Sequence, residues 1–463
     1  MALEHNFDVQ ISRKNPEIDV YGLNSSYGAY DPAFRMTQSE GFNSRPGAFS
    51  ASTGLTAPSS QVTSDVYSPA IVGGIPTGAT YSIGSVNSPL LVRNSGNLIA
   101  GYQYATSAGI SVTQPLLKNM WTDLTRETIE LNKRTLVIDE LGFTFQLITS
   151  VSAVETAYYE LIFSLENVKV QQRALEVAEQ LLAENKKRVE VGALAPLDEK
   201  QAESQVAASR ASLLDAVRGV ASAQNALKTL ITDDYSTLHE TSIVPTETLV
   251  AVPESLNLQD CWRTAFTARP DLQQQRQKVE KQNVVLRFTH NQLFPQLDLN
   301  ATYGQNGLGT SLDSGFSGLQ SGKNQFYSYQ LTLTIPFSNL AARNTHKQNV
   351  ALKEQLVLQL KQYEQFVLVD VDNAVETVRS TFQKVEATRD ARVYAEDALA
   401  AERKKLENGK STSFVVLQLL SNLTTARSNE IRALADYNEA LTTLSQKEGT
   451  TLERHKLTVQ VVH

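Results

Sequence analysis

The stretches KKRVEVGALAPLDEKQAE (residues 186–203) and ERKKLENGKSTSFVVLQL (residues 402–419) share one pattern. Each has a basic patch, a Glu, a Gly soon after it and then a second helical pattern. Because Gly commonly ends a helix, each stretch predicts a tight turn between two helices. Repetition of the turn predicts two helical hairpins in one chain.

The residue types around each Gly suit the ends of helices. Asn408 and Gly409 suit a helix C-terminus, and Ser411 to Ser413 suit the N-cap of the next helix. Pro196 suits the first turn of a helix, where Asp198 lies near the positive end of the helix dipole. The basic residues before each turn complement the negative C-terminal end of the preceding helix.

Apolar residues before each turn recur in steps of four and three, as in the seam of a coiled coil. A helix of roughly 70 residues is predicted before each turn, about 105 Å long at 1.5 Å per residue. The seam residues are Leu147, Val151, Val154, Tyr158, Leu161, Leu165 and Val168 in the first half, and Val371, Val375, Val378, Phe382 and Val385 in the second.

The two halves of the chain are related by an internal duplication. The tetrapeptide AVET at Ala153 recurs at Ala374, and Pro115 corresponds to Pro336. We predict a first structural repeat over 1–240 and a second over 241–463. The first contains a partial helix, hairpin strands about 32–115, a long helix about 117–191 and a helix 196–231. The second contains a linker, a helix about 257–292, hairpin strands about 295–336, a long helix about 340–408 and a helix about 412–448.

Between the paired prolines the hydrophobic period changes to two, which predicts strands. In YSYQLTLTI, Tyr327, Tyr329 and Leu331 oppose Ser328 and Gln330. The other strands alternate in the same way, so each half offers one hairpin with an apolar and a polar face. The stretches 41–97 and 304–324 are predicted to be solvated loops, the first with an extra hairpin around ATYSIGSV. Residues 232–257 are predicted to be a linker packed against the helices.

Composition excludes several functions. The net charge of -7 gives no electrostatic footprint for nucleic acid, and the single Cys261 excludes an internal disulfide. No run approaches the ~18 to 20 apolar residues of a spanning helix. No nucleophile elbow, phosphate loop, dinucleotide fingerprint or HExxH motif is present, and Asp370 and Asp372 fit a solvated or tunnel-lining face. We therefore predict a protein that is not an enzyme and has no cofactor or metal.

A small sheet with one solvated face would explain the strands alone. Three features favour a barrel shared by several chains: the Tyr-rich apolar face, an opposite face of Ser, Thr and Gln, and the lack of any element to cover them. Closure of such a barrel would give an apolar exterior and a polar lumen and would remove exposed sheet edges.

The chain resembles the TolC-like family of outer-membrane efflux factors over nearly its whole length. The first-half motifs are ALEHNFDVQISRKNPEI, GAYDP, ISVTQPLL and VGALAPLDEKQAE, and the second-half motifs are ARPDLQQQ, LFPQLDLNATYG, LTLTIPFSN and ENGKSTSFVVLQ. The resemblance implies a mainly α fold with a mixed α/β character. Long antiparallel coiled-coil hairpins would form a periplasmic tunnel, and four strands per chain would form a trimeric transmembrane β-barrel. The implied partners are two further copies in a homotrimer, a periplasmic adaptor (membrane fusion) protein, an inner-membrane pump of RND or ABC type, and outer-membrane lipid.

The resemblance also implies roles for residues of the two turns. The turns would be the periplasmic tips, where the adaptor docks and the channel gates. The residues concerned are Arg188, Gly192, Ala195, Pro196, Asp198, Lys404, Lys405, Gly409, Lys410 and Ser411. Val415 and Gln418 occupy the places where family members constrict the tunnel with acidic residues, so no acidic ring is expected here. An ion pair between Asp198 and Lys410 is a further hypothesis.

The resemblance implies a location in the cell outer membrane of a Gram-negative organism, with a periplasmic extension. MALEHNFDVQISRKNPEI has no basic region followed by an apolar one, so no export signal is identified and Met1 is expected to mark a shortened or misplaced start. The expected function is the passive conduit of a tripartite efflux or type I secretion system. The alternatives are a conduit dedicated to type I protein secretion and a soluble coiled-coil spacer.

Overall fold

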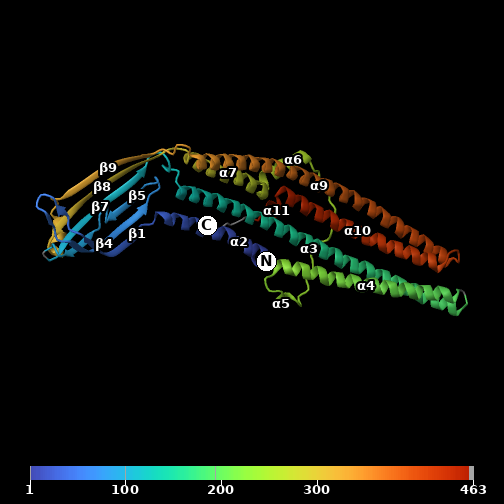
Figure 1. The fold of residues 1–463 in the computed structure, drawn as a ribbon. Coiled ribbons are helices and arrows are strands. Elements are labelled where there is room, and N and C mark those ends of the chain that lie inside the picture. The colour runs from blue at the N-terminus through green and yellow to red at the C-terminus, as the bar shows by residue number, and fades with distance from the viewer. Residues whose placement is uncertain (1, 100, 193, 458–463) are drawn as a thin grey trace. The chain divides into compact units, whose positions relative to one another are not determined.

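The computed structural model describes residues 2–99, 101–192 and 194–457, in two compact units (Figure 1). The helical unit comprises described residues up to 17, from 137 to 276 and from 358 onward, and the sheet unit comprises those of 18–136 and 277–357. Each unit contains segments from both halves of the sequence, so the two units are not the two predicted repeats. The boundary between the repeats at residue 240 stays a prediction. The expectation about Met1 lies outside the described residues.

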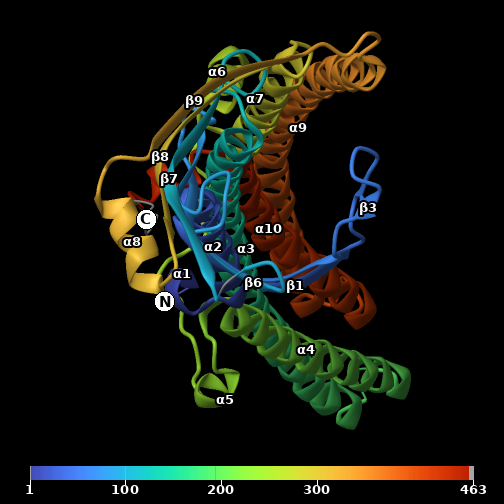
Figure 2. The ribbon, with the colours of Figure 1, turned by 60° about the vertical axis from the view of Figure 1, so that its left-hand side comes forward.

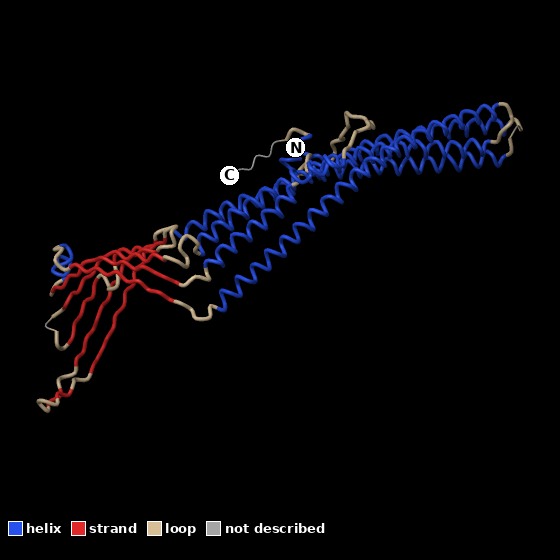
Figure 3. Tube along the Cα trace, turned by 90° about the horizontal axis from the view of Figure 1, so that it is seen from above, coloured by secondary structure: helices blue, strands red, loops and turns tan. Residues whose placement is uncertain are grey.

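The helical unit is built around two antiparallel hairpins, drawn in blue in Figure 3. The first joins α3 (Leu124–Glu190) to α4 (Pro196–Ile231), and the second joins α9 (Leu340–Glu407) to α10 (Ser413–Glu448). The short helices of the chain are α1 (Ala2–His5), α2 (Phe7–Tyr27), η1 (Gly28–Tyr30), α5 (Tyr235–Leu238), α6 (Leu258–Ala268), α7 (Pro270–Asn291), α8 (Leu312–Gln320) and α11 (Thr451–Arg454).

The predicted seams pack as a coiled coil requires. In the second half, Val371, Val375, Val378 and Val385 are buried, and Phe382 packs against them. In the first half, Leu147 and Leu161 are buried, and Val154, Tyr158 and Leu165 pack against Leu161 and its neighbours. The partner helix α4 buries small residues seven positions apart, which lets the helices approach closely: Ala202, Ser209, Ala216 and Ala223.

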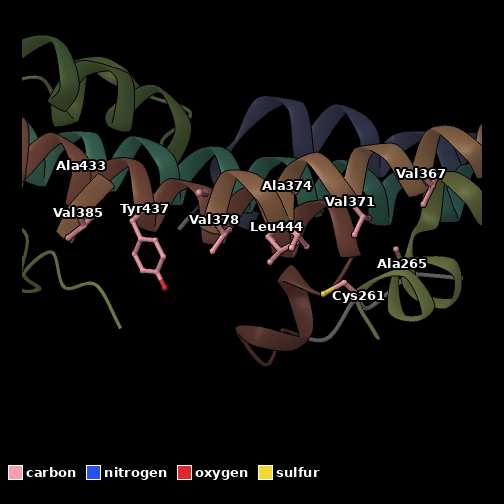
Figure 4. Close-up of a cluster of buried hydrophobic side chains, with 12 residues drawn as sticks. Cys261, Ala265, Val367, Val371, Ala374, Val378, Val385, Ala433, Tyr437 and Leu444 are labelled. Atoms are coloured by element: carbon pink, nitrogen blue, oxygen red, sulfur yellow. The ribbon is translucent and has the colours of Figure 1, made fainter. Parts of the chain in front are cut away.

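One cluster of buried side chains joins α6, α9 and α10 (Figure 4). Tyr437 lies against Phe382, with ring centroids 5.5 Å apart, and its hydroxyl donates to the carbonyl of Val252. This bond holds the segment after α5 against the helices, as expected for residues 232–257. In the same cluster, burial raises the pKa of the Cys261 thiol to about 12, so this thiol stays protonated and inert.

The predicted helix over about 257–292 is wrong as one helix, because the chain breaks between α6 and α7. Arg269 has the extended ψ of 116° that a residue before Pro favours, and Pro270 then opens α7. The break directs the buried Arg269 side chain to two carboxylates. Its Nη2 donates to Oδ2 of Asp271 at 2.6 Å and its Nη1 to Oδ2 of Asp370 at 3.0 Å.

Asp370 therefore corrects a sequence expectation. Its side chain is mostly buried, and its Oδ2 forms an ion pair with Nζ of Lys447 at 3.1 Å. Asp370 therefore links α9 to α10 instead of lining a solvated face. Asp372 is exposed. Asp271 accepts a further bond from the Tyr363 hydroxyl at 2.8 Å. Burial raises the pKa of Asp271, but the Arg269 and Tyr363 bonds outweigh it, and the pKa is lowered.

The sheet unit contains a seven-stranded antiparallel sheet, drawn in red in Figure 3. The strand order is β1-β4-β5-β7-β8-β9, and β6 also pairs with β4 and β7. A separate small sheet pairs β2 with β3. The bounds are β1 (Ala33–Arg45), β2 (Phe49–Ser50), β3 (Leu55–Thr56), β4 (Ser60–Gly74), β5 (Thr80–Gly84), β6 (Leu91–Gly96), β7 (Gln103–Pro115), β8 (Gln296–Gly309) and β9 (Gln325–Thr334).

Two expectations about this sheet are wrong. The stretch 41–97 is not mainly solvated loop, because it holds the end of β1 and all of β4, β5 and β6. Consequently β1 pairs with β4 and not with β7, and the sheet has more than four strands. The stretch 304–324 contains α8, which lies beside β7 and β8 (Figure 2). The Thr106 hydroxyl donates to the Gly315 carbonyl at 2.8 Å and ties α8 to β7.

One described helix, α3, is long and apolar enough by length and composition to cross a membrane, whereas the sequence analysis found no run that approaches a spanning helix. An 18-residue window within it has a mean hydropathy of 1.3. A packed helix passes the same test, and α3 buries Phe143, Leu147 and Ile148 in a cluster with Val9 and Leu452. The window is therefore weak evidence for a membrane span.

We predict that Asp271→Asn destabilises the helical unit by about 3 kcal/mol, because it leaves the buried Arg269 incompletely paired. The measurement is the denaturant midpoint, followed by the fluorescence of Trp262 in a Trp121→Phe background. Asp372→Asn, at an exposed position of α9, is the control and should leave the midpoint unchanged. Equal midpoints for the Asp271 and Asp372 variants would contradict the prediction.

The same contact predicts a pH dependence. Because the pKa of Asp271 is lowered on folding, its contribution is complete above the ordinary carboxyl pKa of about 3.9 and is lost as pH falls through the folded-state pKa. The difference in stability between the wild type and Asp271→Asn should therefore narrow below about pH 3.9. A difference that stays constant from neutral pH to acid would contradict this assignment.

Candidate functional site

The turn between α3 and α4 is closed by backbone hydrogen bonds. The amide of Gly192 donates to the Val189 carbonyl at 2.9 Å, and the amide of Leu194 donates to the Arg188 carbonyl at 3.2 Å. Gly192 has a φ of 73°, a left-handed conformation that favours glycine. This conformation ends α3 and reverses the chain, as the sequence predicts.

Ala195, Pro196 and Asp198 begin α4. Pro196 occupies the first helical turn, where its missing amide proton is not needed. The Asp198 carboxylate turns back and accepts from the amide of Ala195 at 3.2 Å. The carboxylate also lies at the positive end of the helix dipole, at the place that the sequence predicts for Asp198.

The turn between α9 and α10 has the same construction. Gly409 has a φ of 70°, and its amide donates to the Leu406 carbonyl at 3.1 Å. The amide of Lys410 donates to the Lys405 carbonyl at 2.8 Å. Asn408 adds a side-chain bond to the Lys404 carbonyl at 2.8 Å, so the predicted helix end at Asn408 and Gly409 is confirmed.

The predicted N-cap of α10 is only partly correct. Thr412 occupies the N-cap position, but its side chain makes no capping bond. The Ser411 hydroxyl instead donates to Oε1 of Glu402 at 2.5 Å, while Lys405 contacts Oε2 of Glu402 at 2.8 Å. The Lys405 bond, with that of Ser411, lowers the pKa of Glu402. The contacts of Ser411 and Lys405 with Glu402 hold the second turn against the end of α9.

Asn185 connects the two turns, a contact that the sequence analysis missed. Its side-chain amide donates to the Ser413 hydroxyl at 2.5 Å and to the Asp198 carbonyl at 3.4 Å. Asn185 and Ser413 are both buried. A buried polar pair of this kind is costly to break, because the remaining partner is left without water or a bond. A signal was available in the sequence, since Asn185 lies on the helix face of the apolar residues Leu181 and Leu182.

Apolar side chains directly behind the turns join the two hairpins. Leu181 of α3, Ala202 of α4, Leu399 and Leu406 of α9, and Val416 of α10 belong to one buried cluster. The two hairpin ends therefore pack together as one body within the helical unit. The turns themselves project from this body, because Val191, Gly192, Asn408 and Gly409 are exposed.

The basic residues of the turns make few ion pairs. Lys186 lies 3.6 Å from Glu203, and Lys405 pairs with Glu402. Among the described residues, the structure does not bring Asp198 and Lys410 together as an ion pair, because the Asp198 carboxylate binds its own turn. Lys404 and Lys410 are exposed, and Arg188 is half-buried.

Val415 and Gln418 lie one helical turn apart on an exposed face of α10. The Gln418 amide donates to the Asn422 side chain at 3.2 Å. No carboxylate stands at either position, as the sequence analysis noted. This face therefore combines one apolar and two neutral polar side chains.

A second charged cluster, also missed from the sequence, links three helices farther from the turns. Arg432 of α10 contacts Glu160 of α3, Asp436 at 2.6 Å and Glu439 at 3.4 Å. Lys384 of α9 reaches Asp436 at 2.8 Å. Burial raises the pKa of Glu439 to about 7 despite the nearby Arg432. The residues are far apart in sequence, which is why no local motif reveals them.

Neither the turns nor this cluster has the arrangement of a metal site. Within residues 2–99, 101–192 and 194–457, no group of three or more His, Cys, Asp or Glu side chains could hold a metal ion. The turns offer exposed backbone, basic side chains and exposed Val191, Leu197 and Phe414. Such a surface is suited to binding another protein.

The sequence matches the family model described as outer membrane efflux protein over residues 90–232 and 263–450, more than half of the chain. Both turns and all the candidate residues named above fall within the matched regions. No curated protein matches the chain significantly.

Solved structures with a similar fold include three outer-membrane or membrane proteins. A membrane protein from Pseudomonas aeruginosa has a TM-score of 0.69 at 18% identity, covering 97% of this chain and 91% of that one. The CmeC outer membrane channel of Campylobacter jejuni has a TM-score of 0.67 at 14% identity, with 98% and 87% covered. The outer membrane protein VceC of Vibrio cholerae has a TM-score of 0.67 at 14% identity, with 97% and 94% covered. These likenesses support the mainly helical fold with a sheet portion.

We predict that Asn185→Ala loosens both turns, because it leaves the buried Ser413 hydroxyl unpaired. Amide hydrogen exchange of peptides covering residues 185–200 and 405–420 should become about tenfold faster, the effect of losing about 1.4 kcal/mol of local stability. Gln418→Ala, on an exposed face of the same region, is the matched control. If exchange in both peptides equals that of the control, the contact does not hold the turns together.

Proposed function

The chain belongs to the outer membrane efflux protein family, and we propose that three copies form the outer-membrane channel of a tripartite efflux or type I secretion system. In this proposal the sheet unit spans the outer membrane and the hairpins form a periplasmic tunnel. The channel is passive, and an inner-membrane pump supplies the energy.

The observation that carries the proposal is the exposed apolar face of the sheet. Tyr303, Tyr327, Tyr329 and Leu331 share this face and are between 51% and 76% exposed. Contiguous exposed apolar surface of this kind marks a membrane or protein contact. The opposite face carries Ser, Thr, Gln and Asn, as expected for a polar lumen.

The two turns support docking of a periplasmic adaptor. Their exposed surface combines apolar Val191, Leu197 and Phe414 with the basic residues Lys404 and Lys410. Apolar anchors surrounded by charged residues are typical of protein interfaces. In the proposal, the adaptor binds here and shifts the packing of the two hairpins around Asn185.

The alternatives predict different observations. A type I secretion conduit would have the same structure and would pair with an ABC exporter, so co-purification with an ABC or an RND pump distinguishes protein secretion from small-molecule efflux. A soluble coiled-coil spacer would leave the apolar face of the sheet without a function, and it would remain monodisperse without detergent.

We predict discrete, long-lived single-channel steps from the full-length, signal-processed protein in planar bilayers. The sample should be a detergent-solubilised oligomer of the mass of three chains. Heat-dissociated protein from the same preparation is the control and should give no steps. A rod-like species that needs no detergent and never inserts would refute the channel.

We also predict that Val415→Asp makes the channel more selective for cations. In a trimer the change would place three carboxylates on the α10 face that includes Gln418, at the proposed tunnel constriction. The ratio of cation to anion permeability, from reversal potentials in a salt gradient, should rise several-fold. Val415→Asn has nearly the same shape without the charge and should leave the ratio unchanged. An unchanged ratio in both variants would place Val415 outside the conducting path.

A further inference from the structure

The sheet contains more strand positions than the four per chain implied by the resemblance. β5 pairs with residues 70–74 of β4, and β6 pairs with residues 62–67 of the same strand. Both also pair with β7. β5 and β6 therefore lie end to end in one position, and the sheet has six positions in the order β1, β4, β5 with β6, β7, β8 and β9.

A row of apolar side chains crosses all six positions. The registers place neighbouring strands in the pairs Phe34 with Ile71, Ile71 with Ile83, Ile83 with Ile110, Ile110 with Tyr303, and Tyr303 with Tyr327. Paired residues of adjacent strands share one face of the sheet. Every member of this row is between 43% and 74% exposed. The apolar face therefore continues without interruption through β4 and β5.

The other face carries a row of small hydroxyl side chains on β5, β7, β8 and β9, which continues as Val72 on β4 and Ala33 on β1. Ser82 of β5 pairs with Ser111 of β7, which pairs with Thr302 of β8, and Thr302 pairs with Ser328 of β9. On the apolar face, β4 and β6 carry the ion pair of Asp65 with Arg93 several residues beyond the row. β5 thus has the alternation of a barrel strand, with Tyr81 and Ile83 on the apolar face and Thr80 and Ser82 on the other, and β4 continues the apolar outer row through Ile71.

The topology is compatible with closure between copies. All the pairings are antiparallel, and six positions are an even number, so β1 of one chain and β9 of the next run in opposite directions. Within the described residues, neither the outer edge of β1 nor that of β9 has a partner strand. β1 begins directly after η1, as β8 begins shortly after α7, so each of these two strands follows a helix along the chain. Long exposed edges are normally paired or blocked.

We infer that each chain contributes six strand positions to the barrel, so that three copies close an 18-position barrel (three times six) through β1 of one copy and β9 of the next. The inference rests on the proposed function. Because barrel diameter grows roughly linearly with strand number, this barrel is about 1.5 times wider than one with four positions per chain. The wider lumen suits bulkier exported molecules.

Disulfide mapping of the seam tests the inference. In a Cys261→Ala background, Thr37→Cys on β1 is combined in turn with Ser328→Cys, Gln330→Cys and Thr332→Cys on β9, all on the polar face. Three positions are tested because closure of a barrel staggers the register. A second set combines Ser82→Cys on β5 with the same three changes on β9. This set tests the alternative in which β1 and β4 lie outside the barrel and β5 of one copy meets β9 of the next.

Each outcome has a defined meaning. Covalent oligomers from at least one Thr37 combination, on non-reducing gels of the oxidised trimer, support the inference. Cross-links only from the Ser82 set, or from neither set in an intact trimer, overturn it and leave the proposed function in place. Absence of any trimer overturns the proposed function itself.

Labelling in liposomes gives a second, independent test. A water-soluble maleimide should modify Ser82→Cys in the lumen but not Ile83→Cys, which would face lipid. The same contrast between Ser111→Cys and Ile110→Cys on β7 serves as the control. Equal modification of both β5 positions, with the β7 contrast intact, would place β5 outside the membrane and overturn the inference.

Discussion

Burial of a seam of side chains along the helices, in steps of four and three on α9 and of seven on α4, is the constraint from which the helical unit follows. Most of the stability of a helix in a protein comes from packing its apolar face, so α3 and α9 each need a partner along their length. The small residues of α4, seven positions apart from Ala202 to Ala223, allow that close approach. An antiparallel partner in turn requires a tight reversal, which Gly192 and Gly409 provide. The candidate site is thus a consequence of the coiled-coil packing.

The two sequence repeats have similar apolar patterns, but they differ in their buried polar contacts. Asp8, in the first turn of α2, is exposed, whereas Asp271, in the first turn of α7, is buried against Arg269. Arg269 reaches Asp271 because Pro270 breaks the second-half helix there. Asn185 likewise acts once, joining the first turn to the second. Burial of a charge or an amide requires a specific partner, so these few contacts fix how the helices are held.

The sheet depends on a different constraint, the alternation of side chains between two faces. A shift of one residue in any pairing would move Ile71 or Ile83 to the polar face. The observed registers keep the apolar row continuous from Phe34 to Tyr327. This continuity supports the proposed membrane function, and it extends to β4, a strand that the sequence analysis assigned to a solvated loop.

The sequence by itself determined the long helices, both turns and the two faces of the outer strands, because these depend on local periodicity and on residues with restricted backbones. Gly409 and Pro196 could be assigned from their neighbours alone. Only the tertiary structure decided the break at Arg269, the Asn185 to Ser413 contact and the places of β4, β5 and β6. The first two depend on residues far apart in the chain. The alternation of β4 and β6 lies within a stretch rich in Gly, Ser and Pro, from which only the ATYSIGSV segment of β5 was predicted. Local pattern predicts which face is apolar, whereas the pairing of distant segments decides what that face meets.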